Sequence, residues 1–332
     1  MTFLFASSLS RCLRSRVLIA SLLAILFSAG ELRAQPDSSS RLPVQQRIQN
    51  QLSLLHNLEQ TKASASERGY QWALLGAQYT TAGDFVNSES SYNHALQILS
   101  AETSTIARYT DVLDQLGALY RIYGRIPEAL NCRRKALALR QQLGDPLEIA
   151  RSKSHLAELA LMSHNFKDAF NNADQAYESM SRLQDPEQSD LVSALIVRSY
   201  AECALHKCDH GVADAQQALA IGRSAFAADS VPVGAAMIAL GSAELKSGAT
   251  AEAGNAVRQA LQIFKTQFAA DDPRLSYVMQ QYRDCLLAQH QKREAREIDD
   301  QLSTLNRSSD RQSAPSCPSC TVSVFGLRTP AH

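Results

Sequence analysis

The sequence LDQLGALYRIYGRIPEALNCRRKALAL, from Leu113 to Leu139, predicts two short amphipathic helices joined by a tight turn. Leu116 and Tyr120 lie one helical turn apart on an apolar stripe, and Gly117 is small enough to let a neighbouring helix approach closely. Gly124 predicts the end of the first helix. Because neither helix can bury its stripe alone, the pair must pack against similar pairs.

Similar helix pairs recur before and after this stretch. A small residue early in each second helix marks them, and the markers are separated by 41, 40, 44, 40 and 42 residues. The six markers are Ser88, Ala129, Ala169, Ala213, Ala253 and Ala295. Self-similarity at so regular a period predicts an all-α, right-handed superhelical solenoid of about six antiparallel helix pairs.

The first repeat carries the most specific series of residues. Its members are Trp72, Leu75, Gly76 and Tyr79 in the first helix, and Ser88, Tyr92 and Ala95 in the second. This series resembles the tetratricopeptide repeat, and the period of about 42 residues resembles the kinesin-light-chain type more than the 34-residue type. The resemblance covers about residues 65–305 and implies a helical solenoid.

Acidic and proline residues stand together in the connectors between the repeats. They are Asp145-Pro146, Asp185-Pro186, Asp229 to Pro232, and Asp271-Asp272-Pro273. Asp can cap the next helix while Pro occupies its first turn, so each pair predicts the start of the first helix of a repeat.

Composition supports an all-α protein and argues against nucleic-acid binding. Hydrophobic residues make up 45% of the chain and aromatic residues only 6%, with 14 glycines and 10 prolines in 332 residues. The formal net charge is zero, and without a leader ending at Ala34 it becomes about −3, from 29 basic and 32 acidic residues. A surface that follows a phosphate backbone needs a basic excess that this chain lacks.

The two ends of the chain differ from the repeats. Residues 1–34 combine three arginines before a 13-residue apolar run with a polar end after it, which is the pattern of a signal peptide, cleaved after Gly30 or after Ala34. An uncleaved anchor, the alternative, would be the only membrane contact. We further predict a polar linker at 35–43, a capping helix at 44–62, the repeat array at 65–305 and a disordered tail at 306–332. The leader predicts export, to the periplasm or as a secreted protein.

The cysteines and histidines allow several interpretations. Cys317 and Cys320 in the tail form a CxxC pair, for which a disulfide or inert thiols, an intermolecular link, and a metal or redox site are the alternatives. The remaining cysteines outside the leader fall within repeats, where core packing is expected; they are Cys132, Cys203, Cys208 and Cys285. His206 and His210 could share a metal only if one helix ran through both, and a turn is predicted between them.

No sequence motif of a catalytic site is present. The chain has no Ser-His-Asp order, no glycine-rich phosphate loop and no HExxH sequence, so we predict neither an enzyme nor a cofactor nor a metal. Glu158 and Glu202 fall on the first helices of adjacent repeats. A groove contact or a solvated pair is expected for them rather than glycosidase chemistry, because a solenoid offers no closed, dry pocket.

The groove of the array is the predicted functional surface. Residues of the first helices that lie off the packing stripe are expected to line a concave face: Asp114, Arg121, Arg151, His155, Glu158, Arg198, Glu202 and His206. Because they mix both signs, the groove is suited to a peptide or helix of a protein partner. We therefore predict a non-catalytic protein–protein interaction adaptor. The alternative is a self-assembling structural or assembly protein of the cell envelope, and the oligomeric state is left open.

Overall fold

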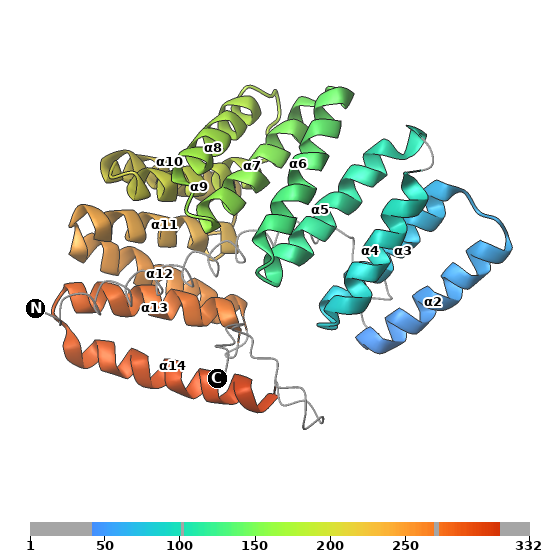
Figure 1. The fold of residues 1–332 in the computed structure, drawn as a ribbon. Coiled ribbons are helices and arrows are strands. Elements are labelled where there is room, and N and C mark those ends of the chain that lie inside the picture. Colours follow the sequence, from blue (N-terminus) through green and yellow to red (C-terminus); the bar gives the residue numbers. More distant parts are fainter. Residues whose placement is uncertain (1–41, 101–102, 269–271, 313–332) are drawn as a thin grey trace, which may run out of the picture.

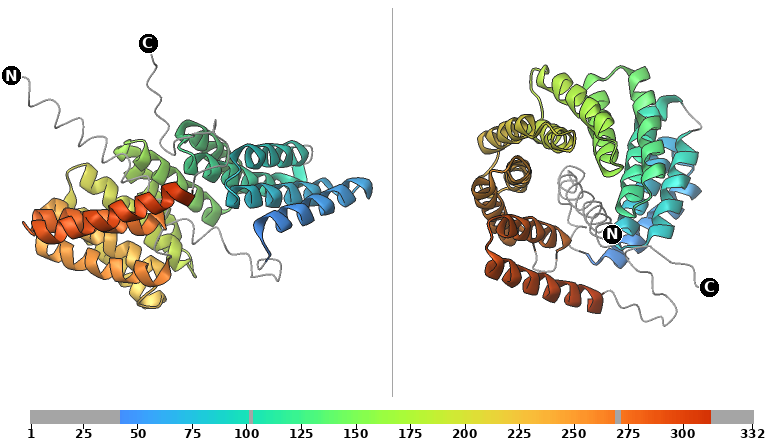
Figure 2. Two further views of the ribbon diagram at one scale, coloured as in Figure 1. Left: turned by 90° about the horizontal axis from the view of Figure 1, so that it is seen from below. Right: turned by 60° about the vertical axis from the view of Figure 1, so that its left-hand side comes forward.

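The computed structural model describes residues 42–100, 103–268 and 272–312, which form thirteen α-helices, one short 3-10 helix and no strand. The helices are α2 (Val44–Gln60), α3 (Ala65–Thr81), α4 (Phe85–Leu99), η2 (Thr103–Thr105), α5 (Ile106–Ile122), α6 (Ile126–Leu143), α7 (Pro146–Met162), α8 (Phe166–Ser181), α9 (Gln188–Ala204), α10 (Cys208–Ala225), α11 (Val231–Ser247), α12 (Thr250–Gln267), α13 (Pro273–Ala288) and α14 (Lys292–Gln312). Successive helices follow a curved path (Figures 1 and 2). The predicted all-α solenoid of helix pairs is confirmed.

Each helix packs on its neighbours in the chain, which is the arrangement a repeat array requires. The six pairs are α3 with α4, α5 with α6, α7 with α8, α9 with α10, α11 with α12, and α13 with α14. Helix α2 packs on α3 through Ile48 and Leu55, which contact Leu75. It therefore covers the apolar face that the first repeat would otherwise leave exposed.

The small residue that marks each second helix has the same backbone position in every repeat. Its amide donates to the carbonyl oxygen four residues earlier, at the helix start, as Ala129 does to Arg125 at 3.1 Å. In the fourth repeat this residue is Gly211, whose amide donates to Lys207 at 3.1 Å, whereas the predicted marker Ala213 is exposed. With Gly211 in the series the intervals become 41, 40, 42, 42 and 42 residues, so the array is more regular than the sequence alone indicated.

Six turns between paired helices share one backbone conformation. One or two positions after the end of the first helix, every repeat has a residue with a positive φ: Gly83, Gly124, His164, His206, Gly248 and His290. Glycine adopts this left-handed region without steric cost, whereas histidine does so less readily. His206 thus occupies a turn position that glycine fills in the first two repeats.

The Asp-Pro connectors begin some helices as predicted but not all. The Asp145 carboxylate accepts from the amides of Leu147 and Glu148 at 3.0 and 3.3 Å, and Asp272 accepts from Arg274 at 2.9 Å. Pro232 lies in the first turn of α11, where Ser230 holds the N-cap position. The prediction is wrong for Asp185-Pro186, because α9 begins only at Gln188.

The apolar core falls into two large clusters within the described residues. One joins the first two repeats, from Ala73 to Ala136, and also includes Leu159 of α7. The other runs from Ala157 in the third repeat to Leu302 in the sixth. Helix α7 contributes to both clusters, and the ion pairs of Arg133 and Arg140 with Asp114 lie beside it.

The C-terminal end of the array is longer than expected. Helix α14 continues to Gln312, so the prediction of a disordered tail from residue 306 is wrong for 306–312. The segment contains neither Gly nor Pro, and Pro315 is the first residue that would oppose a helix. The predicted signal peptide and the Cys317–Cys320 pair lie outside the described residues. Among the helices described, none has the length and apolar character needed to span a bilayer.

Candidate functional site

Half of the eight residues predicted to line a groove take part in two polar clusters between the helices, and three of the eight are buried. Arg121, Glu158 and Glu202 are exposed by only 8%, 2% and 6%, so their side chains offer a ligand little surface. The expectation that they face a groove is therefore wrong for these three. Asp114 and Arg198 are also largely covered, because each is held in ion pairs with neighbouring helices. Off-stripe positions of a helix are exposed only where no neighbour covers them, and here the adjacent helices do.

The first cluster, which we call the α5–α7 cluster, joins the second and third repeats. Arg133 of α6 donates from Nη1 to Asp114 Oδ1 at 2.8 Å and to His155 Nδ1 at 2.7 Å. Arg140 of α6 pairs with the other oxygen of Asp114, and contacts Ser152 of α7 at 2.8 Å. The two buried arginines thus cross-link α5 and α7 through α6.

The protonation states of this cluster follow from its burial and its charges. Burial alone would raise the pKa of Asp114, but the positive charges of Arg133 and Arg140 outweigh it and the pKa lies below its usual value. Burial lowers the pKa of His155 far below its usual value, and the nearby charge of Arg133 lowers it further. His155 is therefore neutral, with Nδ1 accepting from Arg133.

The second cluster, which we call the α9–α10 cluster, lies in the fourth repeat. Arg198 of α9 donates from Nε and Nη2 to the two oxygens of Asp214 in α10, at 2.6 and 2.7 Å. It also contacts Asp174 of α8 at 2.6 Å. Such two-pronged pairing with a carboxylate fixes the arginine in orientation. Arg198 thus links α8, α9 and α10 through its ion pairs.

Glu202 lies one turn beyond Arg198 and carries the most perturbed carboxyl of the cluster. Burial and the negative charge of Asp214 raise the pKa of Glu202 to about 7. The exposed His210 also lies nearby, with Nδ1 3.7 Å from Oε1 of Glu202. A raised carboxyl pKa is a feature of some active sites. Here, however, the Glu202 side chain is buried by packing, and its neighbour Asp214 is held in the ion pair with Arg198.

Replacing Glu202 by glutamine should make the protein less sensitive to alkaline pH. Because the folded-state pKa is above the unfolded one, stability from Glu202 is present below about pH 4.5 and is lost as the pH rises towards 7. Glutamine keeps a donor for Asp214 without ionising. We expect Glu202→Gln to raise the free energy of unfolding by about 1 to 2 kcal/mol at pH 8, and much less at pH 5. Denaturant unfolding at both pH values measures this.

The control is Glu178→Gln, at a position on α8 whose side chain is 54% exposed. It should change stability little at either pH. An equal gain at pH 5 and pH 8 for Glu202→Gln would contradict the assignment of a raised pKa.

Two of the predicted groove residues keep more exposed surface. Arg151 of α7 is 34% exposed, and its guanidinium bridges Asp190 of α9 at 2.8 Å and Glu148 at 2.9 Å. His206 is exposed in the turn between α9 and α10. The turn separates His206 from His210, and no group of three or more metal-binding side chains is assembled in the residues described.

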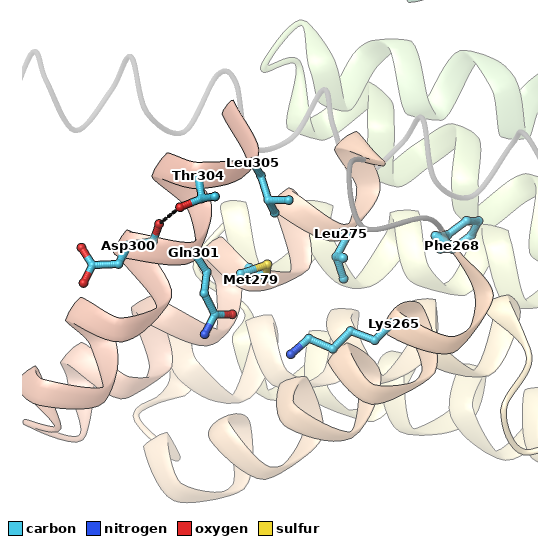
Figure 3. Close-up of a pocket in the computed structure, with 8 residues that line it drawn as sticks. All are labelled: Lys265, Phe268, Leu275, Met279, Asp300, Gln301, Thr304 and Leu305. Carbon is cyan, nitrogen blue, oxygen red and sulfur yellow. Dashed lines mark hydrogen bonds between the residues drawn. The ribbon is translucent and has the colours of Figure 1, made fainter. Parts of the chain in front are cut away.

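An apolar pocket lies at the C-terminal end of the array, where the end of α12, the first half of α13 and the middle of α14 come together (Figure 3). Its volume is about 510 Å³. Buried Leu275 and Met279 form its floor, and Phe268 and Leu305 form its apolar walls. The exposed rim carries four polar side chains: Lys265, Asp300, Gln301 and Thr304. The pocket combines an apolar interior with a few polar groups of both signs.

Sequence reasoning did not find this pocket. Its residues come from the fifth and sixth repeats, and the sixth matches the repeat pattern least well, with Arg283 where a small residue is expected. The available signal was Leu305, an apolar residue at the predicted end of the array. Whether that residue is packed or open depends on the spacing of α12 and α14, which no local pattern specifies.

The helix pairs and their packing define a tetratricopeptide-like helical-repeat protein. No protein-family model matches the chain, and no curated protein matches it. Among solved structures, it is similar to BtubC (BKLC) from P. vanneervenii with a TM-score of 0.59 and 19% identity, covering 68% of this chain and 92% of that one. RapI in its apo form gives 0.55 and 14%, covering 76% and 71%. A Rap protein complexed with Competence and Sporulation Factor gives 0.54 and 12%, covering 78% and 80%. At sequence identities this low, the similarity shows a shared fold.

Proposed function

We propose that this chain is an exported, non-catalytic adaptor that binds an apolar segment of a partner protein in the pocket between α12, α13 and α14. The observation that carries the proposal is the pocket itself. Its volume of about 510 Å³ falls within the usual range for ligand sites, and its apolar floor is shielded while its polar rim is exposed. An apolar side chain of a partner that enters the pocket would be removed from water, and no polar group of the pocket floor would lose a hydrogen-bond partner.

The charges of the rim favour a protein segment over a strongly charged ligand. Lys265 and Asp300 both line the pocket and carry opposite signs. A peptide or helix can satisfy both with its own side chains, and the apolar interior would hold its anchor residue. The first-helix groove is the weaker candidate, because three of its predicted contact residues are buried and two more, Asp114 and Arg198, are held in ion pairs between helices.

The solved structures of similar fold support the architecture that the proposal assumes. The Rap protein of similar fold was solved in complex with a factor, so a helical solenoid of this kind can hold a partner. Export rests on the leader at residues 1–34, and it makes the cell envelope the place to search for the partner.

Filling the mouth of the pocket should abolish partner capture. Thr304 lies on the exposed rim, and its hydroxyl donates to the carbonyl oxygen of Asp300 at 3.0 Å (Figure 3). A tryptophan at this position would occupy the cavity without entering the core. We expect Thr304→Trp to reduce the capture of the specific partner from a native envelope extract by at least about tenfold, as loss of an interface anchor does. Quantitative mass spectrometry of the captured proteins measures the loss.

Thr81→Trp is the matched control. Thr81 is exposed at the end of α3, and its hydroxyl makes the same kind of bond to Ala77 O, at 3.0 Å. A partner retained by Thr304→Trp but lost by the charge reversal Arg151→Glu would place the site in the first-helix groove instead. Light scattering of the purified mature chain addresses the alternative of self-assembly: association that Thr304→Trp abolishes would identify a second copy as the occupant.

A further inference from the structure

Two thiols face each other across the turn that joins α9 to α10. Cys203 lies in the last turn of α9 and Cys208 is the first residue of α10. The Sγ atom of Cys203 lies 4.0 Å from the carbonyl oxygen of Cys208, and Sγ of Cys208 lies 3.7 Å from the carbonyl oxygen of Cys203. Each side chain therefore points towards the other residue, into the same small space.

The backbone of the turn holds the two residues in this arrangement. His206 has a φ of 63°, which reverses the chain, and the amide of Lys207 donates to the carbonyl oxygen of Glu202 at 2.9 Å. Gly211 leaves the room that the Cys203 sulfur occupies, because a Cβ at that position would lie 2.8 Å from it. Any larger residue at 211 would push the thiol away from its present place.

The two thiols differ in access, which gives them different chemical roles. Cys203 is buried, with 6% exposure, whereas Cys208 is half-buried. Burial and the contact with Cys208 raise the pKa of Cys203 to about 12, so this thiol keeps its proton at neutral pH. Cys208 is thus the thiol that an external reagent reaches first.

We propose that Cys203 and Cys208 are a redox pair that closes a disulfide between α9 and α10 when a small disulfide, such as glutathione disulfide, is the oxidant. The Cys208 thiolate attacks one sulfur of the oxidant, forms a mixed disulfide and releases one glutathione thiolate. Cys203 then loses its proton, attacks Sγ of Cys208 and releases the second glutathione. The two protein thiols lose two protons and two electrons, and one glutathione disulfide is reduced to two thiols.

The pair occupies a position where a covalent link would have a structural consequence. Glu202, the neighbour of Cys203, belongs to the α9–α10 cluster. A disulfide would tie the end of α9 to the start of α10 beside that cluster. The inference rests on the two thiols alone and is independent of the proposed binding pocket.

Tryptic mapping of the full chain tests the proposal directly, because Lys207 lies between the two cysteines. Native, reduced protein is incubated with glutathione disulfide, its free thiols are blocked with iodoacetamide, and it is digested. A disulfide joins peptide 199–207 to peptide 208–223 in one linked species, with a loss of about 2 Da relative to the two free peptides. Buried Cys132 and Cys285 are internal controls and should be recovered alkylated only after unfolding.

Two variants keep the outcome decisive. Cys203→Ser should leave Cys208 as a stable mixed disulfide with glutathione, and Cys208→Ser should leave Cys203 unmodified in the native protein. The proposal is overturned if wild-type Cys208 accumulates glutathione without forming the linked peptide. It is also overturned if the linked peptide appears only at denaturant concentrations that unfold the chain.

Discussion

Replacing Asp114 by alanine should lower the free energy of unfolding by about 3 to 5 kcal/mol. Asp114 is the carboxylate that both buried arginines of the α5–α7 cluster share: Arg133 reaches it at 2.8 Å, and Arg140 pairs with its other oxygen. Without this carboxylate, the positive charges of Arg133 and Arg140 stay buried at the junction of the second and third repeats with fewer negative charges to offset them. Guanidinium unfolding followed by circular dichroism and by the fluorescence of Trp72 measures the loss.

The matched control lies one helical turn away on the same helix. Asp111 also pairs with Arg140, at 3.2 Å, but its side chain is 63% exposed. Asp111→Ala should cost less than about 1 kcal/mol, because an exposed ion pair contributes little. Equal losses for the two variants would show that the cluster does not hold the junction. Separate transitions for the two probes in Asp114→Ala would show that the repeats on either side unfold independently.

The second large effect is expected in the core of the fifth repeat. Phe264 is completely buried in α12 and belongs to the cluster that runs through the last four repeats. Phe264→Ala removes most of the side chain and leaves a cavity that rigid helices cannot close, so we expect a loss of about 3 to 5 kcal/mol. The same unfolding experiment measures it, and a loss below about 1 kcal/mol would contradict this packing.

Gly234 of α11 allows a double-mutant test of the same contact. A Cβ at Gly234 would lie 2.7 Å from Cε2 of Phe264, so Gly234→Ala alone should destabilise the protein by about 1 to 3 kcal/mol. In the Phe264→Ala background the closest obstacle is gone, with only Cγ2 of Ile263 still near at 3.3 Å, and alanine is the better helix former. There, Gly234→Ala should become neutral or stabilising. Additive losses would mean that Gly234 does not receive the Phe264 ring.

The repeat pattern was readable from the sequence because it depends on local chemistry. Small residues such as Ala129 recur at the start of second helices, and turn residues such as Gly124 recur after first helices. The one misplaced marker, Ala213, arose in an alanine-rich helix where several positions satisfy the pattern. Only the backbone bond of Gly211 shows which residue is equivalent.

The candidate sites were harder to predict because they depend on which helix covers which side chain. Arg133 lies on α6, whereas its partners Asp114 and His155 lie on two other helices. The prediction that polar residues of the first helices line an open groove assumed that no other helix covers them. In the structure, neighbouring helices bury Glu158 and Glu202 and use Arg198 as a structural link.

By itself the sequence determined the all-α class, the number of helix pairs and the approximate places of their turns, since helical periodicity and turn residues act over a few positions. Only the tertiary structure decided where the charged side chains pair, that an apolar pocket opens between α12 and α14, and that Cys203 and Cys208 face each other. Those features depend on the distances and angles between helices. For the charged pairs and the pocket, helix packing sets these distances and angles through contacts between residues far apart in the sequence, beyond the reach of any local pattern. For Cys203 and Cys208, the turn between α9 and α10 sets them.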